Sequence, residues 1–270
     1  MNMNKLVTGI ATSVFIFGAV IAPAIAHSSH DEGCDVSLNY DVVIEPQKLV
    51  LNQGDTEAYR VDHGKLFVNG EQVELNAKQR KILNTYVDEV STQVPEVIEV
   101  VNEAVSLATE AVTMAFTPLF GEQTSAKFEG LMEGISERIE GVAYQHGDKF
   151  YLGATEDSVE EAFNEEFEKE IESLVQNSLG SMMMALGGQM LSSDGDSFEQ
   201  KMEAFGEKME SIGDDIEKQF ELQGQNLEYK ADKLCENFER LLVIEAQMRD
   251  EIPELNKFPL ADSDSYSSLM

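Results

Sequence analysis

The sequence contains many carboxylates but no arrangement that selects a catalytic pair. It has 51 acidic and 19 basic side chains, and the motifs GxSxG and HExxH and glycine-rich phosphate loops do not occur in it. Sugar hydrolysis would need two carboxylates at a fixed separation, and the absence of Trp removes a common platform for stacking sugars. We therefore expect no enzyme activity and no cofactor. A hydrolase with a non-standard carboxylate site is the less favoured alternative.

The acidic residues between positions 157 and 172 resemble a calcium site only in their number. Calcium loops place Asp, Asn and Gly at fixed offsets within a turn. The acids here follow a helical pattern, so their side chains point in several directions. We expect a solvated helix face and no metal site.

The methionines at 182–184, with Met190 close by, could form a soft Cu(I) site or an adaptable apolar surface. Adjacent residues of a helix point in different directions, so three consecutive methionines cannot line one metal site. Core packing is the simplest interpretation of this segment. Met182, Met183 and Met190 remain candidates for an apolar binding surface.

The first 26 residues have the pattern of a cleaved export signal. Lys5 precedes an apolar run over residues 6–21, and the small residues of Ala24-Ile25-Ala26 predict cleavage between Ala26 and His27. An uncleaved membrane anchor is the alternative, but the run is shorter than the ~20 residues that a spanning helix needs. We expect a mature chain of residues 27–270 in the periplasm, with a flexible start over 27–34.

Export changes the interpretation of the two cysteines, Cys34 and Cys235. In an oxidising compartment an even pair predicts one disulfide. It would close a loop of about 200 residues, which the chain-entropy model values at roughly 5 kcal/mol. A redox or metal-binding thiol is the alternative, but neither CxxC spacing nor a flanking basic cluster supports it.

The formal net charge of −32 restricts the partners of the protein. Nucleic acid and anionic membranes are disfavoured, whereas cationic partners are favoured. No stretch after the signal is long and apolar enough to span a membrane.

Residues 35–75 are predicted to form a small antiparallel β-meander. Residues 36–44 alternate between apolar and polar side chains, with Ser37, Asn39 and Asp41 on the polar face. Asn69-Gly70 separates two short apolar runs and fits a type I′ hairpin turn.

The helical region is predicted over residues 76–250, with a short hairpin near 142–152. Asn76 and Gln79 form a capping box. We expect a kink or a restart at Pro95 and an end at Pro118. Apolar residues at spacings of three and four predict helices at about 77–117, 125–142, 157–190 and 198–250.

The composition of residues 251–270, which contain Pro253, Pro259 and a Ser/Asp-rich end, predicts a disordered tail. The expected fold is therefore α+β, with a small N-terminal antiparallel β region followed by an elongated, mostly antiparallel helical bundle.

Five segments together carry a resemblance to a known family. They are residues 34–40 (CDVSLNY), 64–70 (GKLFVNG), 73–80 (VELNAKQR), Pro95 and residues 232–235 (DKLC). In these segments the chain resembles the YggN-like family of uncharacterised exported bacterial proteins, a domain of unknown function. The resemblance implies a periplasmic location and a Cys34–Cys235 disulfide, and it brings no catalytic residues.

The sequence thus predicts a non-enzymatic periplasmic protein whose amphipathic helices bind an envelope protein or a peptide, with a chaperone-like role as one form of this. The alternative is a structural protein that forms homo-oligomers through the apolar seam of residues 198–241.

Overall fold

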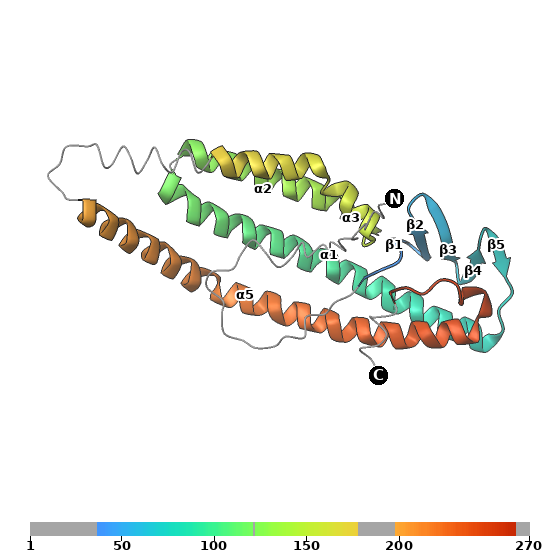
Figure 1. Ribbon diagram of the computed structural model, residues 1–270. Coiled ribbons are helices and arrows are strands. Elements are labelled where there is room, and N and C mark those ends of the chain that lie inside the picture. Colours follow the sequence, from blue (N-terminus) through green and yellow to red (C-terminus); the bar gives the residue numbers. More distant parts are fainter. Residues whose placement is uncertain (1–36, 121, 178–197, 263–270) are drawn as a thin grey trace, which may run out of the picture. The chain divides into compact units, whose positions relative to one another are not determined.

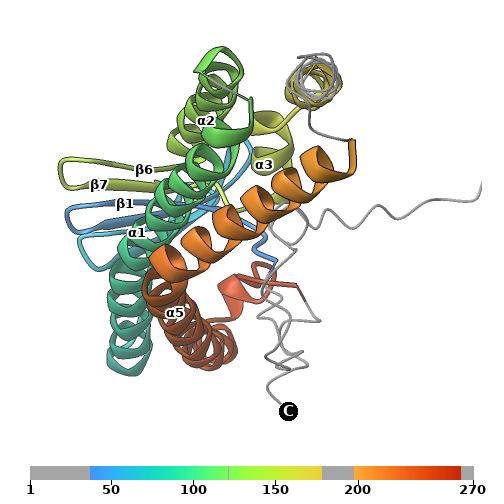
Figure 2. The same cartoon turned by 90° about the vertical axis from the view of Figure 1, so that its left-hand side faces the viewer.

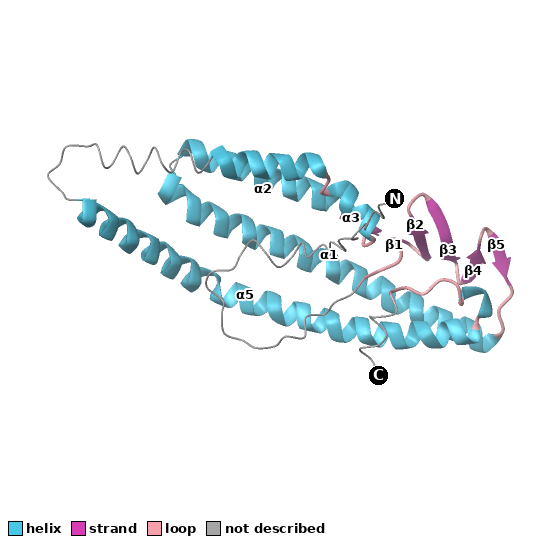
Figure 3. Cartoon of the chain, in the orientation of Figure 1, coloured by secondary structure: helices cyan, strands magenta, loops and turns pink. Residues whose placement is uncertain are grey.

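The computed structural model describes residues 37–120, 122–177 and 198–262. The fold is α+β, with an antiparallel sheet and long helices, as the sequence predicted (Figures 1 and 3). The helices α1 (Ala77–Phe120), α2 (Glu122–Val142) and α5 (Phe198–Glu251) are the longest of the described elements. Helix α1 lies between the other two and contacts both (Figure 2).

The sheet has seven strands in the order β5-β4-β3-β2-β1-β7-β6. The strands are β1 (Asp41–Glu45), β2 (Lys48–Gln53), β3 (Thr56–Asp62), β4 (Lys65–Val68), β5 (Glu71–Val73), β6 (Ala143–His146) and β7 (Lys149–Leu152). The first five form the predicted meander, and β6 and β7 form the predicted hairpin. The sequence did not reveal that β7 pairs with β1, which joins the hairpin to the meander in one sheet.

Two of the hairpin turns have the backbone conformation that a type I′ turn requires. Asn69 and Gly70 have φ values of 51° and 80°, and His63 and Gly64 have φ values of 49° and 72°. Glycine at the second position adopts a positive φ without a steric cost, so the Asn-Gly signal correctly predicted this turn.

Helix α1 begins at the predicted capping box. The Asn76 Oδ1 atom accepts hydrogen bonds from the Lys78 and Gln79 amides, at 2.8 and 3.0 Å, and Gln79 Oε1 accepts from the Asn76 amide at 2.9 Å. The helix then continues without a restart through Pro95 and ends at Phe120, two residues beyond Pro118. Pro95 removes one backbone hydrogen bond, but Val94 and Ile98 on either side are buried in the core, which favours the continuous helix.

The predicted single helix over 157–190 is interrupted. Helix α3 (Glu156–Ala162) ends before Asn164, and residues 165–177 form the next helix. The Asn164 Oδ1 atom accepts hydrogen bonds from the Glu166 and Phe167 amides, at 3.1 and 3.3 Å, and so caps the second helix. Residues 178–190 lie outside the described residues.

The core lies between one face of the sheet, the first half of α1 and the end of α5. The hydroxyls of Tyr59 and Tyr86, both with no exposed surface, are hydrogen-bonded at 3.0 Å. Burial raises the pKa of Tyr59 well above its usual value, so its hydroxyl stays protonated. Apart from this pair and Glu245, the largest fully buried side chains of the described residues are apolar: Leu49, Leu51, Leu66, Leu83, Leu242, Met248, Ile252 and Leu255.

The C-terminal segment up to residue 262 is ordered, which corrects the predicted disordered tail over 251–270. It contains the 3₁₀-helix η1 (Pro253–Leu255), and four of its apolar side chains are buried: Ile252, Leu255, Leu260 and Ala261. The Glu245 carboxylate, which has no exposed surface, accepts a hydrogen bond from the Leu260 amide at 3.1 Å. Proline and serine content suggested disorder, but the burial of these side chains favours the ordered segment. Residues 263–270 lie outside the described residues.

Asp41 is buried, although the alternating pattern placed it on the polar face of its strand. Only 4% of its surface is exposed. Its carboxylate accepts hydrogen bonds from the Thr155 amide at 3.2 Å, the Thr155 hydroxyl at 2.9 Å and the Ser158 hydroxyl at 2.6 Å. The Tyr151 hydroxyl donates a further bond at 3.3 Å. Burial, and next the charge of Asp41, raise the pKa of Tyr151, so that hydroxyl remains a donor.

We predict that Asp41→Ala lowers the free energy of unfolding by about 3 kcal/mol, because it leaves several buried donors without their charged acceptor. Urea unfolding followed by circular dichroism measures the change. The matched control is Asp88→Ala, on the exposed face of α1, for which we expect a change within about 0.5 kcal/mol. Equal effects of the two substitutions would contradict the proposed importance of Asp41.

An acidic groove between α1, α2 and the β6–β7 hairpin

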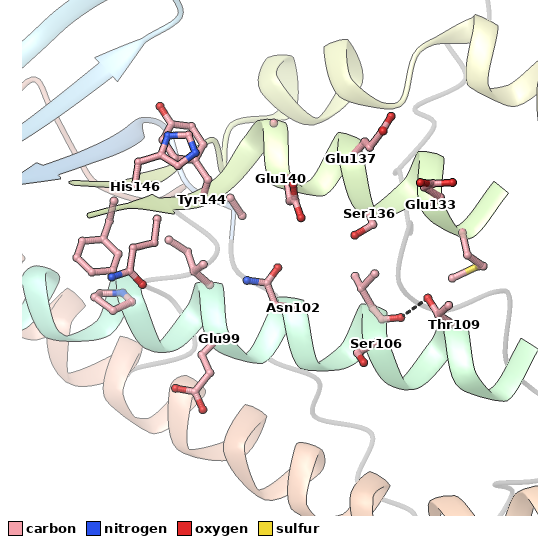
Figure 4. Close-up of a pocket in the computed structure, with 18 of the residues that line it drawn as sticks. Glu99, Asn102, Ser106, Thr109, Glu133, Ser136, Glu137, Glu140, Tyr144 and His146 are labelled. Atoms are coloured by element: carbon pink, nitrogen blue, oxygen red, sulfur yellow. Dashed lines mark hydrogen bonds between the residues drawn. The ribbon is translucent and has the colours of Figure 1, made fainter. Parts of the chain in front are cut away.

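A groove of about 1460 Å³ lies between α1, α2 and the β6–β7 hairpin (Figure 4). Its lining includes seven glutamates and no lysine or arginine: Glu96, Glu99, Glu110, Glu129, Glu133, Glu137 and Glu140. Apolar side chains also contribute, namely Ile98, Val105, Met132, Ala143 and Phe150. The groove thus combines an acidic rim with an apolar floor.

The carboxylates of α1 are matched by polar groups of α5. The ammonium group of Lys230 lies 3.0 Å from a carboxylate oxygen of Glu99 and 2.6 Å from one of Glu103. Hydrogen bonding to Glu103, and then to Glu99, raises the pKa of Lys230. In Figure 4 the Glu99 side chain turns away from α2 toward α5, which agrees with this pairing. Gln219 of α5 also donates a hydrogen bond to Glu110 at 2.6 Å.

The uncharged polar groups of α1 line the side that faces α2. Figure 4 shows Asn102 and Thr109 pointing from α1 toward α2, and Ser106 contributes to the same wall. The Thr109 hydroxyl donates to the Val105 carbonyl at 2.7 Å, which leaves its oxygen free to accept from a ligand. The α1 wall therefore offers hydrogen-bonding groups, and its glutamates Glu96, Glu99 and Glu110 all accept hydrogen bonds from α5, with Glu99 alone of these three in an ion pair among the described residues.

The carboxylates of α2 form what we call the α2 glutamate row: Glu129, Glu133, Glu137 and Glu140. All four are exposed, and the described residues contain no ion pair to any of them. Like charges three or four residues apart repel each other on a helix, and negative charge in the last turn is also disfavoured by the helix dipole. The row therefore lowers the stability of α2. The last turn of α2 contains no Lys or Arg whose positive charge could offset this repulsion.

The hairpin closes one end of the groove. All four residues of β6, Ala143 to His146, line it together with Phe150 of β7. The ring centres of Tyr144 and His146 lie 4.7 Å apart with the ring planes tilted by 34°, and the ring of Tyr144 also lies 5.2 Å from that of Tyr151. Aromatic rings beside carboxylates provide a surface on which a cation or an apolar side chain can pack.

The outer face of α2 is held by the helix of residues 165–177. The Arg138 guanidinium lies 4.7 Å from the centre of the Phe167 ring and 3.8 Å from the carboxylate of Glu170. Met132 and Ile139 of α2 are buried. The Arg138 contacts and the buried side chains of Met132 and Ile139 together hold α2 in place, and with it the glutamate row.

The groove contains few kinds of polar group. Its polar groups are carboxylates, hydroxyls, amides, one phenol and one imidazole. In the described part of the chain, no three His, Cys, Asp or Glu side chains are grouped to hold a metal ion. Acidic groups over an apolar floor suit a ligand that is both cationic and apolar.

Most residues that the sequence singled out lie outside the part of the chain that the structure describes. Ala26, His27, Cys34, Met182, Met183 and Met190 are outside the described residues, so the structure does not test the predictions made for them. Cys235 is half-buried in α5. The sequence analysis missed the groove, although the spacing of Glu129, Glu133, Glu137 and Glu140 was a visible signal.

A family model covers most of the chain, including all the described strands and the residues of the groove. The model is described as "Protein of unknown function (DUF2884)", and it matches residues 34–261. The chain belongs to this family. No curated protein and no solved structure matches the chain. Among the described helices, none has the length and apolar character needed to cross a membrane.

We predict that the triple variant Glu133→Gln, Glu137→Gln, Glu140→Gln is more stable than the natural chain, by about 0.5–1 kcal/mol at low ionic strength, because repulsion within the row is removed. Chemical denaturation at low and high salt measures the gain, which should shrink as salt screens the charges. The control, Glu99→Gln with Glu103→Gln, should change stability in the opposite direction because it removes the partners of Lys230. A stability loss in the triple variant would contradict this account of the row.

Proposed function

We propose that this protein is an exported binding protein that holds a cationic, partly apolar segment of a partner in the groove between α1 and α2. The observation that carries the proposal is the α2 glutamate row, whose charges have no ion pair within the described chain. Charges that lower the stability of the free protein are explained if a partner neutralises them.

The contrast between the two walls supports this proposal. Both helices present glutamates, but Lys230 pairs with Glu99 and Glu103 on the α1 side. Acidic residues are abundant throughout a sequence of net charge −32, so acidity alone would not single out a site. The combination of unmatched carboxylates, an apolar floor and a large concave volume distinguishes this groove.

Binding without catalysis is favoured over a hydrolase. Catalysis by a carboxylate pair requires one acid with a raised pKa beside one that stays ionised. The exposed glutamates of the row occupy similar surroundings, which makes such a division of roles unfavourable.

The periplasm is the proposed location. The support is the leader pattern of residues 1–26, with cleavage between Ala26 and His27, and the likeness to the YggN-like exported proteins. The family match begins at Cys34 and includes Cys235. We propose that these two cysteines form a disulfide that ties the start of the family domain to α5.

Self-association through the seam of α5 receives less support. That helix contacts α1 along its length, through pairs such as Gln219 with Glu110 and Lys230 with Glu103. The side of α5 that the seam would need for a second copy is therefore used at least partly within the chain.

We predict that a labelled twelve-residue peptide of alternating lysine and valine binds the mature protein, and that Glu133→Gln, Glu137→Gln, Glu140→Gln weakens binding about tenfold, which corresponds to about 1.4 kcal/mol. Fluorescence anisotropy measures the affinity. Raising NaCl from about 50 to about 500 mM should also weaken it.

The matched control for this experiment is Glu207→Gln, Glu210→Gln, Glu217→Gln, which changes the net charge equally on exposed positions of α5. Its affinity should stay within about twofold of the natural protein, because these three residues are exposed and do not line the groove. If both triple variants lose the same affinity, the peptide responds to overall charge and the groove is not the site.

For export we predict that protein recovered from the periplasmic fraction begins at His27 and gains two hydrogens on reduction. Intact-mass spectrometry before and after treatment with a reductant measures both features. Retention of residues 1–26, or an unchanged mass on reduction, would contradict the proposed location or the proposed disulfide respectively.

A further inference from the structure

The strand β6 occupies one end of the sheet order and pairs with β7 alone among the described residues. We propose that the partner binds as an extended peptide that adds a strand to the outer edge of β6 and places its basic side chains against the α2 glutamate row. This inference rests on the proposed function and specifies the conformation of the ligand. An open sheet edge is a common docking site for extended peptides, because its backbone groups are unpaired.

The lining of the groove indicates that the edge of β6 faces it. Successive residues of a strand point to opposite faces of the sheet, so a groove on one face is lined by every second residue. Here Ala143, Tyr144, Gln145 and His146 all line the groove. Four consecutive lining residues are expected where the groove reaches the edge of the strand.

The hydrogen-bond pattern of the hairpin identifies which backbone groups point outward. The Gly153 amide donates to the Val142 carbonyl at 2.6 Å. Hydrogen-bonded and non-hydrogen-bonded pairs alternate along an antiparallel ladder. Because Val142 and Gly153 form a hydrogen-bonded pair, the pairs Tyr144–Tyr151 and His146–Lys149 are also hydrogen-bonded. Gln145 lies between them in a non-hydrogen-bonded pair, so its N–H and C=O groups point away from β7 to the open edge.

The C-terminal end of the α2 glutamate row, at Glu140, lies beside this edge. Glu140 precedes Ala143 by three residues, and both line the groove with Tyr144. In Figure 4, Glu140 points toward α1, into the space that continues from the hairpin between the two helices. A peptide that pairs with Gln145 therefore lies within reach of the nearest carboxylates of the row.

The charge of the chain favours a separate partner over its own segments as the occupant. Residues 1–36, 178–197 and 263–270 contain one lysine, Lys5, and no arginine. These segments cannot neutralise the four carboxylates of the row. A basic peptide, with lysine or arginine at alternating positions and apolar residues between them, has the required charge and can direct its apolar face to the groove floor.

The test compares Gln145→Pro with Gln145→Ala in the mature protein, using the alternating lysine–valine peptide. Proline removes the outward N–H group and is tolerated on an edge strand, whereas alanine keeps the backbone donor. We expect binding to Gln145→Pro to be about tenfold weaker than binding to Gln145→Ala, because the two variants both lack the Gln145 side chain and differ in the backbone donor. In the natural protein, hydrogen exchange at the Gln145 amide should slow when the peptide is added.

Several outcomes would overturn the strand pairing. The first is equal affinity of the peptide for the two variants. The second is an unchanged rate of hydrogen exchange at the Gln145 amide when the peptide binds the natural protein. This second measurement decides the question even if Gln145→Pro does not fold. A third is tighter binding of a peptide with the same composition but lysines spaced for a helix. In all three cases the loss of binding in the glutamate-row variant would still stand, so failure of this inference is distinguishable from failure of the proposed function.

Discussion

The pairing of β1 with β7, secured by Asp41, is the contact on which the rest of the structure depends. Strand β1 has β2 on one side and β7 on the other, so it joins two parts of the chain that are about a hundred residues apart in sequence. A buried carboxylate is tolerated only when its oxygens are hydrogen-bonded. Asp41 meets that condition with donors from Tyr151, Thr155 and Ser158, and this fixes both the hairpin and the start of α3 relative to β1.

The same principle applies where the chain returns to the sheet at its C-terminal side. Glu245 is fully buried, and its carboxylate lies 2.7 Å from the Arg249 side chain and accepts from the Leu260 amide. The Leu260 carbonyl in turn accepts a hydrogen bond from the backbone amide of Asn39 at 2.9 Å. Leu38 and Ala261 form an isolated antiparallel β-bridge. Buried polar groups from remote segments are thus paired with each other, which favours one register over alternatives. The family match spans the region that these contacts close, from residue 34 to residue 261.

Local signals predicted the elements, whereas long-range contacts determined what the sequence analysis missed. The Asn69-Gly70 turn and the Asn76 cap depend on residues within four positions of each other, and both were visible in the sequence. The burial of Asp41 depends on Thr155 and Ser158, so the strand pattern, which assigned this carboxylate to the polar face, did not reveal that it is buried. The groove was missed for a similar reason, because its walls become adjacent only after β7 pairs with β1 and α2 packs on α1.

The pairing of charges distinguishes the two walls of the groove in a way that composition cannot. Glutamates of α1 are matched by Lys230 and Gln219 from α5, and they therefore contribute to the contact between these helices. The α2 row has no such role in the described chain, and the helix dipole disfavours the charge of its last member, Glu140, in the final turn. A fold under selection for stability alone would be improved by replacing these residues. Their presence on a supported wall, beside an apolar floor and a strand that pairs with β7 alone among the described residues, is the arrangement that the proposed binding function requires.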